Sequence, residues 1–142
     1  MQNAYGFLAM VLLVAGLGVS TSAAPVMAAG TGQVAGAPDW QSQPLRLMMV
    51  DQQGCFYCAQ WDAEIGPGFD QSAEGRMAPL MRVDIDGPWP DGIVLDSAPA
   101  LTPAFILLER GVELGRIEGY VGAKYFYPVL TEMMKDAGKA LK

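Results

Sequence analysis

The sequence predicts an α/β domain with a central mixed β-sheet that helices cover on both faces. Short apolar runs typical of buried strands alternate with segments whose apolar residues recur every three or four positions, as in a helix. Two of the strand-like runs are joined by Arg110-Gly111, which favours a hairpin and hence an antiparallel pair. The 142 residues, of which 51% are hydrophobic, allow one domain with a core of ordinary size.

The amino-terminal residues predict an export signal. Phe7–Val19 is an apolar run with the length of a signal-peptide core, shorter than the roughly twenty residues that span a bilayer. Small residues near Ala24 and Ala28 are typical of a cleavage site. Because Met1–Gly6 carries no Lys or Arg, an uncleaved membrane anchor is the alternative. In both cases we expect export to a compartment in which disulfides persist.

Three regions are therefore expected along the chain. Residues 1–28 are assigned to the signal peptide. Residues 29–44 are rich in Gly, Ala, Pro, Ser and Gln, and this composition is typical of a linker. Residues 45–142 are expected to form the folded domain, which has neither an internal repeat nor a block of like charge.

The first elements of the domain are a strand, a helix and a second strand. Leu45–Val50 is a short apolar run that predicts a buried central strand. Cys55–Ile65 has apolar residues three and four positions apart, which favours a helix, and Gly66-Pro67-Gly68 ends or breaks it. Leu80–Ile85 is again strand-like.

A proline-rich loop and a hairpin follow. Gly87–Pro103 contains four prolines and is expected to be mostly loop, with one short helical turn near Ile93–Leu95. Ala104–Glu109 and Val112–Glu118 are the two arms of the predicted hairpin.

The carboxyl-terminal segment, Ala123–Leu141, predicts an amphipathic helix. Its apolar residues fall on one helical face: Phe126, Leu130, Met133, Met134, Ala137 and Leu141. Because proline lacks an N–H and crowds the preceding turn, we expect the helix either to kink at Pro128 or to begin near it.

Charge and composition exclude several classes of function. The net charge is −6 without a cluster of Lys and Arg, which argues against nucleic-acid binding, because phosphates are bound by clustered basic residues. The chain has no histidine, so Ser-His and Cys-His catalytic pairs and most zinc sites are excluded. We expect neither a metal site nor a cofactor.

Cys55 and Cys58 are the only cysteines, and their placement indicates redox chemistry. Cys55 lies at the predicted start of a helix, where unpaired N–H groups and the positive end of the helix dipole favour a thiolate. Cys58 is three residues further on, within bridging distance. A Cys-x-x-Cys next to alternating strands and helices is the signature of a thioredoxin-like redox motif, in which Cys55 is expected to attack and Cys58 to resolve.

Cys55 and Cys58 have two other interpretations. A structural disulfide would close a loop of only four residues and stabilise the fold by roughly 2 kcal/mol, the low end for a disulfide. A copper(I) site could use both thiolates and a thioether from Met48 or Met49, although these methionines are expected in the core. A copper-handling or redox-sensing binding module therefore stays as the alternative to an enzyme.

Further residues are candidates for substrate contact. Phe56 and Tyr57 lie between the cysteines and would present aromatic surface to an unfolded or loop segment. Thr102-Pro103 immediately precedes a strand. The proline is explained either by a strand edge that does not require its N–H, or by a cis peptide bond beside the cysteines, with Thr102 offering backbone groups to an extended substrate. Asp51 and Glu64 flank the motif, and either could accept the proton of Cys58 if it points inward.

The chain resembles the exported thioredoxin-fold proteins of the SoxS type, which are associated with bacterial sulfur oxidation. The resemblance rests on Gly54-Cys55-Phe56-Tyr57-Cys58, Trp61-Asp62-Ala63-Glu64-Ile65, Glu74-Gly75-Arg76, Ala78-Pro79-Leu80, Thr102-Pro103-Ala104-Phe105 and Gly115-Arg116-Ile117-Glu118-Gly119-Tyr120. It covers roughly residues 45–130. It implies a thioredoxin fold with Cys55 as the attacking thiol, Cys58 as the resolving thiol and Pro103 as a cis-proline opposite them.

The resemblance also implies a periplasmic thiol reductase. Such a protein is kept reduced by a membrane thiol electron donor and restores a cysteine on a partner protein of the sulfur-oxidation system. We expect a monomer that acts on a disulfide- or thiol-bearing protein, with a disulfide oxidase or isomerase as the alternative direction.

The chain departs from ordinary thioredoxins at three places. Gly54 stands where they have Trp, and Phe56-Tyr57 where they have Gly-Pro. Met49 stands where they have a buried Asp, so the usual proton acceptor for the resolving thiol is missing or moved.

Overall fold

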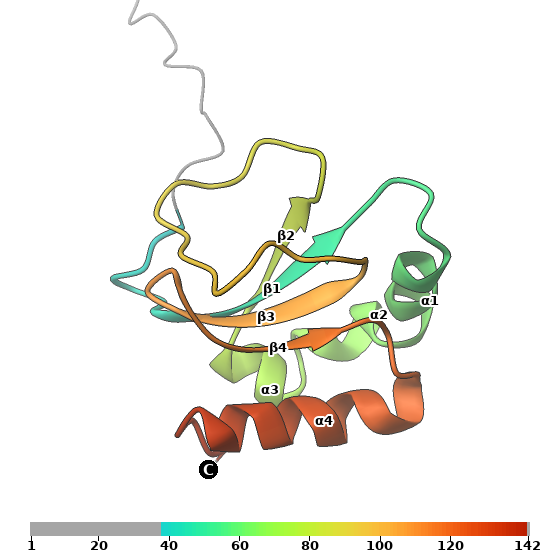
Figure 1. Ribbon diagram of the computed structural model, residues 1–142. Coiled ribbons are helices and arrows are strands. Elements are labelled where there is room, and N and C mark those ends of the chain that lie inside the picture. Colours follow the sequence, from blue (N-terminus) through green and yellow to red (C-terminus); the bar gives the residue numbers. More distant parts are fainter. Residues whose placement is uncertain (1–37, 142) are drawn as a thin grey trace, which may run out of the picture. The chain divides into compact units, whose positions relative to one another are not determined.

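The computed structural model describes residues 38–141 (Figure 1). The signal peptide predicted at 1–28 and the first part of the predicted linker lie outside this range. The elements in chain order are β1 (Leu45–Asp51), α1 (Phe56–Glu64), α2 (Gly66–Phe69), α3 (Ala73–Met77), β2 (Leu80–Asp84), β3 (Ala104–Glu109), β4 (Val112–Glu118) and α4 (Ala123–Asp136). Within residues 38–141 no helix is both long enough and apolar enough to cross a membrane.

The four strands form one mixed sheet in the order β2-β1-β3-β4. β1 runs parallel to β2 and antiparallel to β3, and β3 and β4 form the predicted hairpin. Val50, near the end of β1, pairs with Ala104 at the start of β3. This register brings the chain that follows β1, which carries the cysteines, to the same edge of the sheet as the chain that precedes β3.

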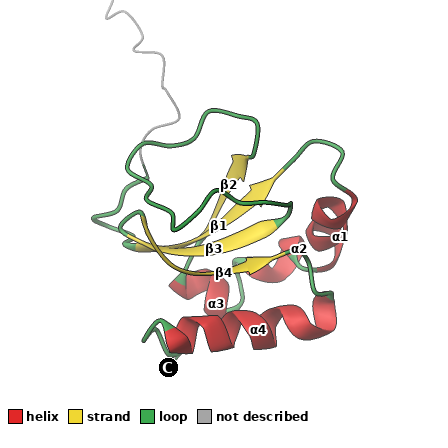
Figure 2. Cartoon of the chain, viewed as in Figure 1, coloured by secondary structure: helices red, strands yellow, loops and turns green. Residues whose placement is uncertain are grey.

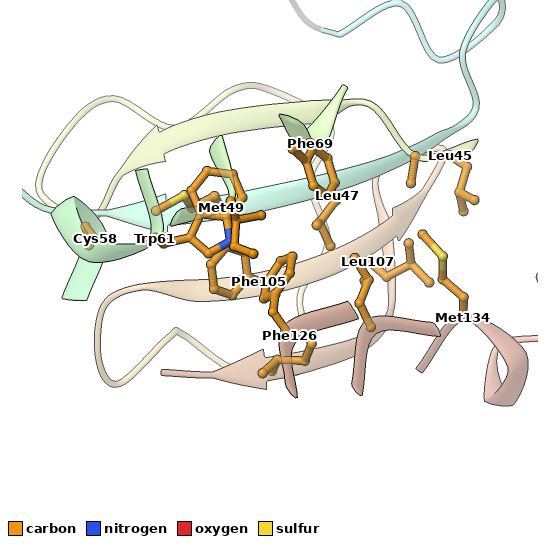
Figure 3. Close-up of a cluster of buried hydrophobic side chains, with 14 residues drawn as sticks. Leu45, Leu47, Met49, Cys58, Trp61, Phe69, Phe105, Leu107, Phe126 and Met134 are labelled. Atoms are coloured by element: carbon orange, nitrogen blue, oxygen red, sulfur yellow. The ribbon is translucent and has the colours of Figure 1, made fainter. Parts of the chain in front are cut away.

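The helices pack on one face of the sheet. In Figure 2, α2, α3 and α4 lie below the sheet and α1 lies at its right-hand end. Four aromatic side chains form the centre of this core, with neighbouring ring centroids between 4.9 and 6.3 Å apart: Trp61, Phe69, Phe105 and Phe126 (Figure 3). Cys58 belongs to the same buried cluster. The redox motif is therefore anchored directly on the main core.

The opposite face is covered by loops, so the prediction of helices on both faces was only half right. Met48, Val50, Val83 and Ile106 form the core there, together with Ala104 and Leu108. Trp40 and the long loop between β2 and β3 pack over them. The helical turn predicted at 93–95 is wrong, because Val94 instead forms a parallel bridge with Val112 on β4.

Two short helices were not predicted. Gly66-Pro67-Gly68 ends α1 as expected, but it also begins α2, where proline is tolerated because a first-turn N–H has no partner within the helix. Ser72 starts α3 by accepting a hydrogen bond from the N–H of Gly75, at 2.9 Å. A side chain at Gly75 would overlap the carbonyl oxygen of Phe69, so this close turn requires glycine.

The terminal helix α4 begins at Ala123 and continues through Pro128. Of the predicted apolar face, Phe126, Leu130 and Met134 are fully buried. Proline at this position removes only one hydrogen bond of the helix, and the burial of the apolar face compensates for it.

Candidate active site

Cys55 is the N-cap residue of α1. The chain turns between β1 and α1 at Gly54, whose φ of +79° is a conformation that glycine adopts readily. Cys55 itself is extended, and its sulfur accepts a hydrogen bond from the N–H of Cys58 at 3.2 Å. The sulfur thus occupies the place that a Ser or Asp oxygen takes in most helix caps.

The hydrogen bonds around Cys55 favour its thiolate. Partial burial acts to raise the pKa of Cys55, but hydrogen bonds from the side chains of Cys58 and Thr102 and from the backbone N–H groups of Cys58 and Tyr57 act in the opposite direction. The net result is a pKa of Cys55 below its usual value. Cys55 is partly accessible and its thiolate is favoured, the two properties that a nucleophilic cysteine needs.

Cys58 has the opposite character. Its side chain is buried, with 4% of the residue exposed, and burial together with the hydrogen bond to Cys55 raises its pKa to about 11. Both cysteines are free thiols in this structure. The two sulfurs therefore differ in access and in acidity, although they lie within one helical turn.

Thr102 and Pro103, immediately before β3, lie next to Cys55. The Thr102–Pro103 peptide bond is cis. The thiol of Cys55 donates a hydrogen bond to the carbonyl oxygen of Thr102 at 3.5 Å. Thr102 is partly buried and Pro103 is buried, and the Pro103 carbonyl oxygen accepts a hydrogen bond from Gly119 at 2.8 Å.

Phe56 and Tyr57 point to solvent. They are 73% and 55% exposed, and their rings meet edge to face at a centroid distance of 5.4 Å. An exposed aromatic pair next to a reactive sulfur offers apolar contact area that the fold itself does not use.

The two flanking carboxylates have different surroundings. Asp51 accepts hydrogen bonds from Arg82, and Glu64 accepts one from the hydroxyl of Tyr120 at 2.6 Å. The hydrogen bond from Tyr120 lowers the pKa of Glu64. Glu64 thus ties α1 to the loop before α4, and only Asp51 lies next to the cysteines.

An open groove of about 350 Å³ runs along one side of the cysteine pair. Asp51, Asp62 and Arg82 line it together with both cysteines, and Arg82 donates to both carboxylates. The sequence did not reveal Asp62 and Arg82 as site residues. Arg82 reaches the site because it lies opposite Met49 in the β1–β2 register, which no local pattern indicates.

Residues 38–141 hold no group of three or more Cys, Asp, Glu or His side chains that could bind a metal ion. Met48 and Met49, the thioether candidates for copper, are both fully buried. Met48 lies in the core of the loop-covered face and Met49 in the core of the helix-covered face, as side chains alternate along a strand.

Comparison with known proteins finds similar chains of solved structure. The chain is 45% identical to the periplasmic thioredoxin SoxS from Paracoccus pantotrophus in its reduced form, with a TM-score of 0.64 over 66% of this chain and 98% of that one. A thioredoxin from Malassezia sympodialis is 16% identical over 64% of this chain and 78% of that one, with a TM-score of 0.43. No protein-family model and no curated protein sequence matches the chain.

Proposed function

Since the chain belongs to the SoxS type of thioredoxin-fold proteins and is a thiol–disulfide oxidoreductase, we propose that it works as a periplasmic reductase of protein disulfides. One observation carries the proposal. The half-buried sulfur of Cys55 lies at the start of α1 among hydrogen-bond donors that favour its thiolate. The neighbouring thiol of Cys58 is buried and protonated.

The proposed reaction has two exchange steps. The Cys55 thiolate attacks one sulfur of the substrate disulfide, so that a mixed disulfide forms and one substrate thiolate leaves. The Cys58 sulfur then attacks the Cys55 sulfur and gives up its proton, which ends on the leaving substrate thiol. The products are a Cys55–Cys58 disulfide and a substrate reduced by two electrons.

The proposed order of attack follows from access and acidity. A buried thiol whose pKa is about 11 is a poor first nucleophile at neutral pH, because almost none of it is ionised. Once Cys55 is part of a mixed disulfide, Cys58 needs only to reach a sulfur one helical turn away. Phe56, Tyr57, Thr102 and Pro103 are the proposed contacts for the substrate segment that carries the disulfide.

Location and partners are part of the proposal. The relative of solved structure is a periplasmic protein. The signal peptide predicted at 1–28 would direct residues 45–142 to the same compartment. We expect the exported domain to be a monomer. There we expect a membrane thiol donor to return the Cys55–Cys58 disulfide to the dithiol, and a cysteine of a sulfur-oxidation protein to be the substrate.

Insulin reduction in the presence of dithiothreitol tests the proposed activity. The wild-type protein is expected to accelerate precipitation of the insulin B chain, and Cys55→Ser is expected to abolish the acceleration. Activity that persists in Cys55→Ser would contradict the role of Cys55.

The direction of electron flow is tested by redox titration. A reductase is expected to have a reduction potential near the roughly −270 mV of thioredoxin. A potential near the roughly −120 mV of the strong periplasmic oxidants would favour the oxidase alternative instead.

The partner can be identified by trapping. Cys58→Ser removes the resolving thiol, so the mixed disulfide on Cys55 should accumulate in the periplasm and can be read by mass spectrometry. Adducts in Cys58→Ser that are missing from a Cys55→Ser control would name the substrate and the electron donor. Equal adduct patterns in the two variants would contradict the proposed exchange.

A further inference from the structure

A buried ion pair lies on β4, outside the groove beside the cysteines. Two nitrogens of Arg116 donate to the two carboxylate oxygens of Glu113, each at 2.6 Å. The side chains are only 15% and 3% exposed. Burying two charges costs desolvation energy, and an apolar pair of similar volume would fill the same space on β4 without that cost. Stabilisation of the sheet therefore does not by itself explain why a charged pair occupies this position.

Besides a contact of Arg116 with Glu118 on the same strand, at 3.3 Å, the pair has two hydrogen bonds to the proline-rich loop. A second interaction of the Glu113 carboxylate is with the N–H of Asp96 at 3.0 Å. Arg116 donates to the carbonyl oxygen of Ser97 at 2.8 Å. One ion pair thus holds two consecutive backbone groups of the loop.

From Ser97 the chain needs only Ala98–Leu101 to reach Thr102. The far end of this segment is also fixed from β4, because the N–H of Gly119 donates to the carbonyl oxygen of Pro103 at 2.8 Å. Between these two anchors little is buried: Ala98, Ala100 and Leu101 are exposed. Hydrogen bonds to β4, rather than apolar packing, therefore set the path of the segment.

We propose that Glu113 and Arg116 are positioning residues that hold Thr102 against the sulfur of Cys55. The proposal deepens the function proposed above and rests on it. Thr102 touches Cys55 through its carbonyl oxygen, and its side chain gives the sulfur a hydrogen bond that lowers the pKa of Cys55, so a displacement of the segment removes a donor from the reactive sulfur. Arginine suits this task, because its planar fork can serve a carboxylate and a carbonyl oxygen at once, and lysine lacks the fork.

The test variant is Arg116→Lys, which keeps the charge and removes the fork. The matched control is Lys139→Met, which breaks another partly buried ion pair, between Lys139 and Glu109, at 2.6 Å. Glu109 is at the end of β3, away from the edge where Val50 meets Ala104, and Lys139 is its side-chain hydrogen-bond partner. Both variants are made in the full chain and compared in the reduced state.

Two measurements follow the segment and the sulfur separately. Hydrogen exchange read by mass spectrometry should be faster at residues 98–102 in Arg116→Lys and unchanged there in Lys139→Met. The rate at which iodoacetamide alkylates Cys55 at pH 7 should fall about three- to tenfold in Arg116→Lys, with its pH profile displaced upward, because a smaller fraction of the sulfur is thiolate. Lys139→Met should keep the wild-type profile.

The opposite results would overturn the proposal. Arg116→Lys with wild-type exchange and alkylation would show that the pair only stabilises the sheet, as would equal changes in the control. If Arg116→Lys fails to fold, Glu113→Gln replaces it; it keeps an acceptor for Asp96 and should show the same two changes in smaller size. Neither measurement uses a disulfide substrate, so failure of the reductase proposal in the insulin assay is distinguishable from failure here.

Discussion

The backbone N–H of Cys58 donates a hydrogen bond to the sulfur of Cys55, 3.2 Å away. The same turn of α1 that buries Cys58 thus supplies a donor to the half-buried sulfur of Cys55. This single relationship separates the two thiols, because it favours the charged form of Cys55 and leaves Cys58 in the core.

The thiol of Cys58 is expected to contribute to the acidity of Cys55. Its side-chain hydrogen bond lowers the pKa of Cys55. Cys58→Ala removes this donor, whereas Cys58→Ser replaces it with a hydroxyl group. The pH midpoint of Cys55 alkylation should therefore be higher in Cys58→Ala than in Cys58→Ser. Identical midpoints would mean that the thiol of Cys58 does not contribute to the acidity of Cys55.

The hydroxyl of Thr102 is expected to act in the same way. Thr102→Val keeps the shape and the backbone carbonyl but removes a side-chain hydrogen bond that lowers the pKa of Cys55. Alkylation at pH 7 should be about two- to fivefold slower than in the wild type. Thr131→Val is the control, because it removes a hydroxyl that donates to Glu74 at 2.8 Å, on the α3–α4 contact. It should lower stability without changing the thiol, and a slower thiol in both variants would refute the assignment.

Phe126 is expected to dominate the stability of the helix-covered core. Its ring contacts those of Trp61, Phe69, Phe105, Tyr120 and Tyr127. Phe126→Ala should lower the free energy of unfolding by about 3–5 kcal/mol, from lost burial and the cavity left behind. Tyr125→Ala, at the neighbouring exposed position, should change it by less than about 0.5 kcal/mol. Urea unfolding followed by tryptophan fluorescence measures both, and similar losses would contradict the packing.

Glu113 is expected to contribute to stability in a pH-dependent way. Its hydrogen bond with Arg116 lowers the pKa of the carboxylate below its usual value of 4.5. A carboxylate with a depressed folded-state pKa stabilises the fold fully above its unfolded-state pKa, and this contribution is lost as the pH falls through the folded-state pKa. The destabilisation caused by Glu113→Gln, about 1–3 kcal/mol at pH 7, should therefore shrink below about pH 4.5.

Denaturant unfolding of wild type and Glu113→Gln at several pH values between 7 and 3 measures this difference. The comparison isolates the contribution of position 113, because the two proteins differ at this residue only. A difference that stays constant, or grows, toward acid pH would contradict the depressed pKa.

The strands and the main helices could be predicted because their signals are local. The hairpin of Ala104–Glu109 and Val112–Glu118 was predicted to the residue, because the two residues Arg110-Gly111 form a tight turn and so mark where each strand ends. The helices α2 and α3 escaped prediction because they have four and five residues, and their sequence is rich in Gly and Pro. The loop cover of the second face escaped as well, since it depends on where Trp40 and Ile93 pack.

The candidate site likewise contains residues that a local sequence signal predicts and residues that it does not. Cys55 and Cys58 are evident from their spacing, because a helix start acts over a few residues only. Thr102-Pro103 entered through the resemblance to a family, since its place beside Cys55 is set by the β1–β3 register across 47 positions of sequence. Asp62, Arg82, Glu113 and Arg116 have no local signature at all. Their contacts depend on the register of the strands, on the face of a helix and on the path of a loop, which only the folded chain brings together.

The most direct test of the account is to locate the first covalent intermediate. The reduced Cys58→Ser and Cys55→Ser variants are mixed with oxidised insulin, quenched in acid and mapped by peptide mass spectrometry. The account predicts a stable mixed disulfide on Cys55 in Cys58→Ser, formed at least about tenfold faster than any adduct on Cys58 in Cys55→Ser. Adducts that form on Cys58 at an equal or higher rate would contradict it.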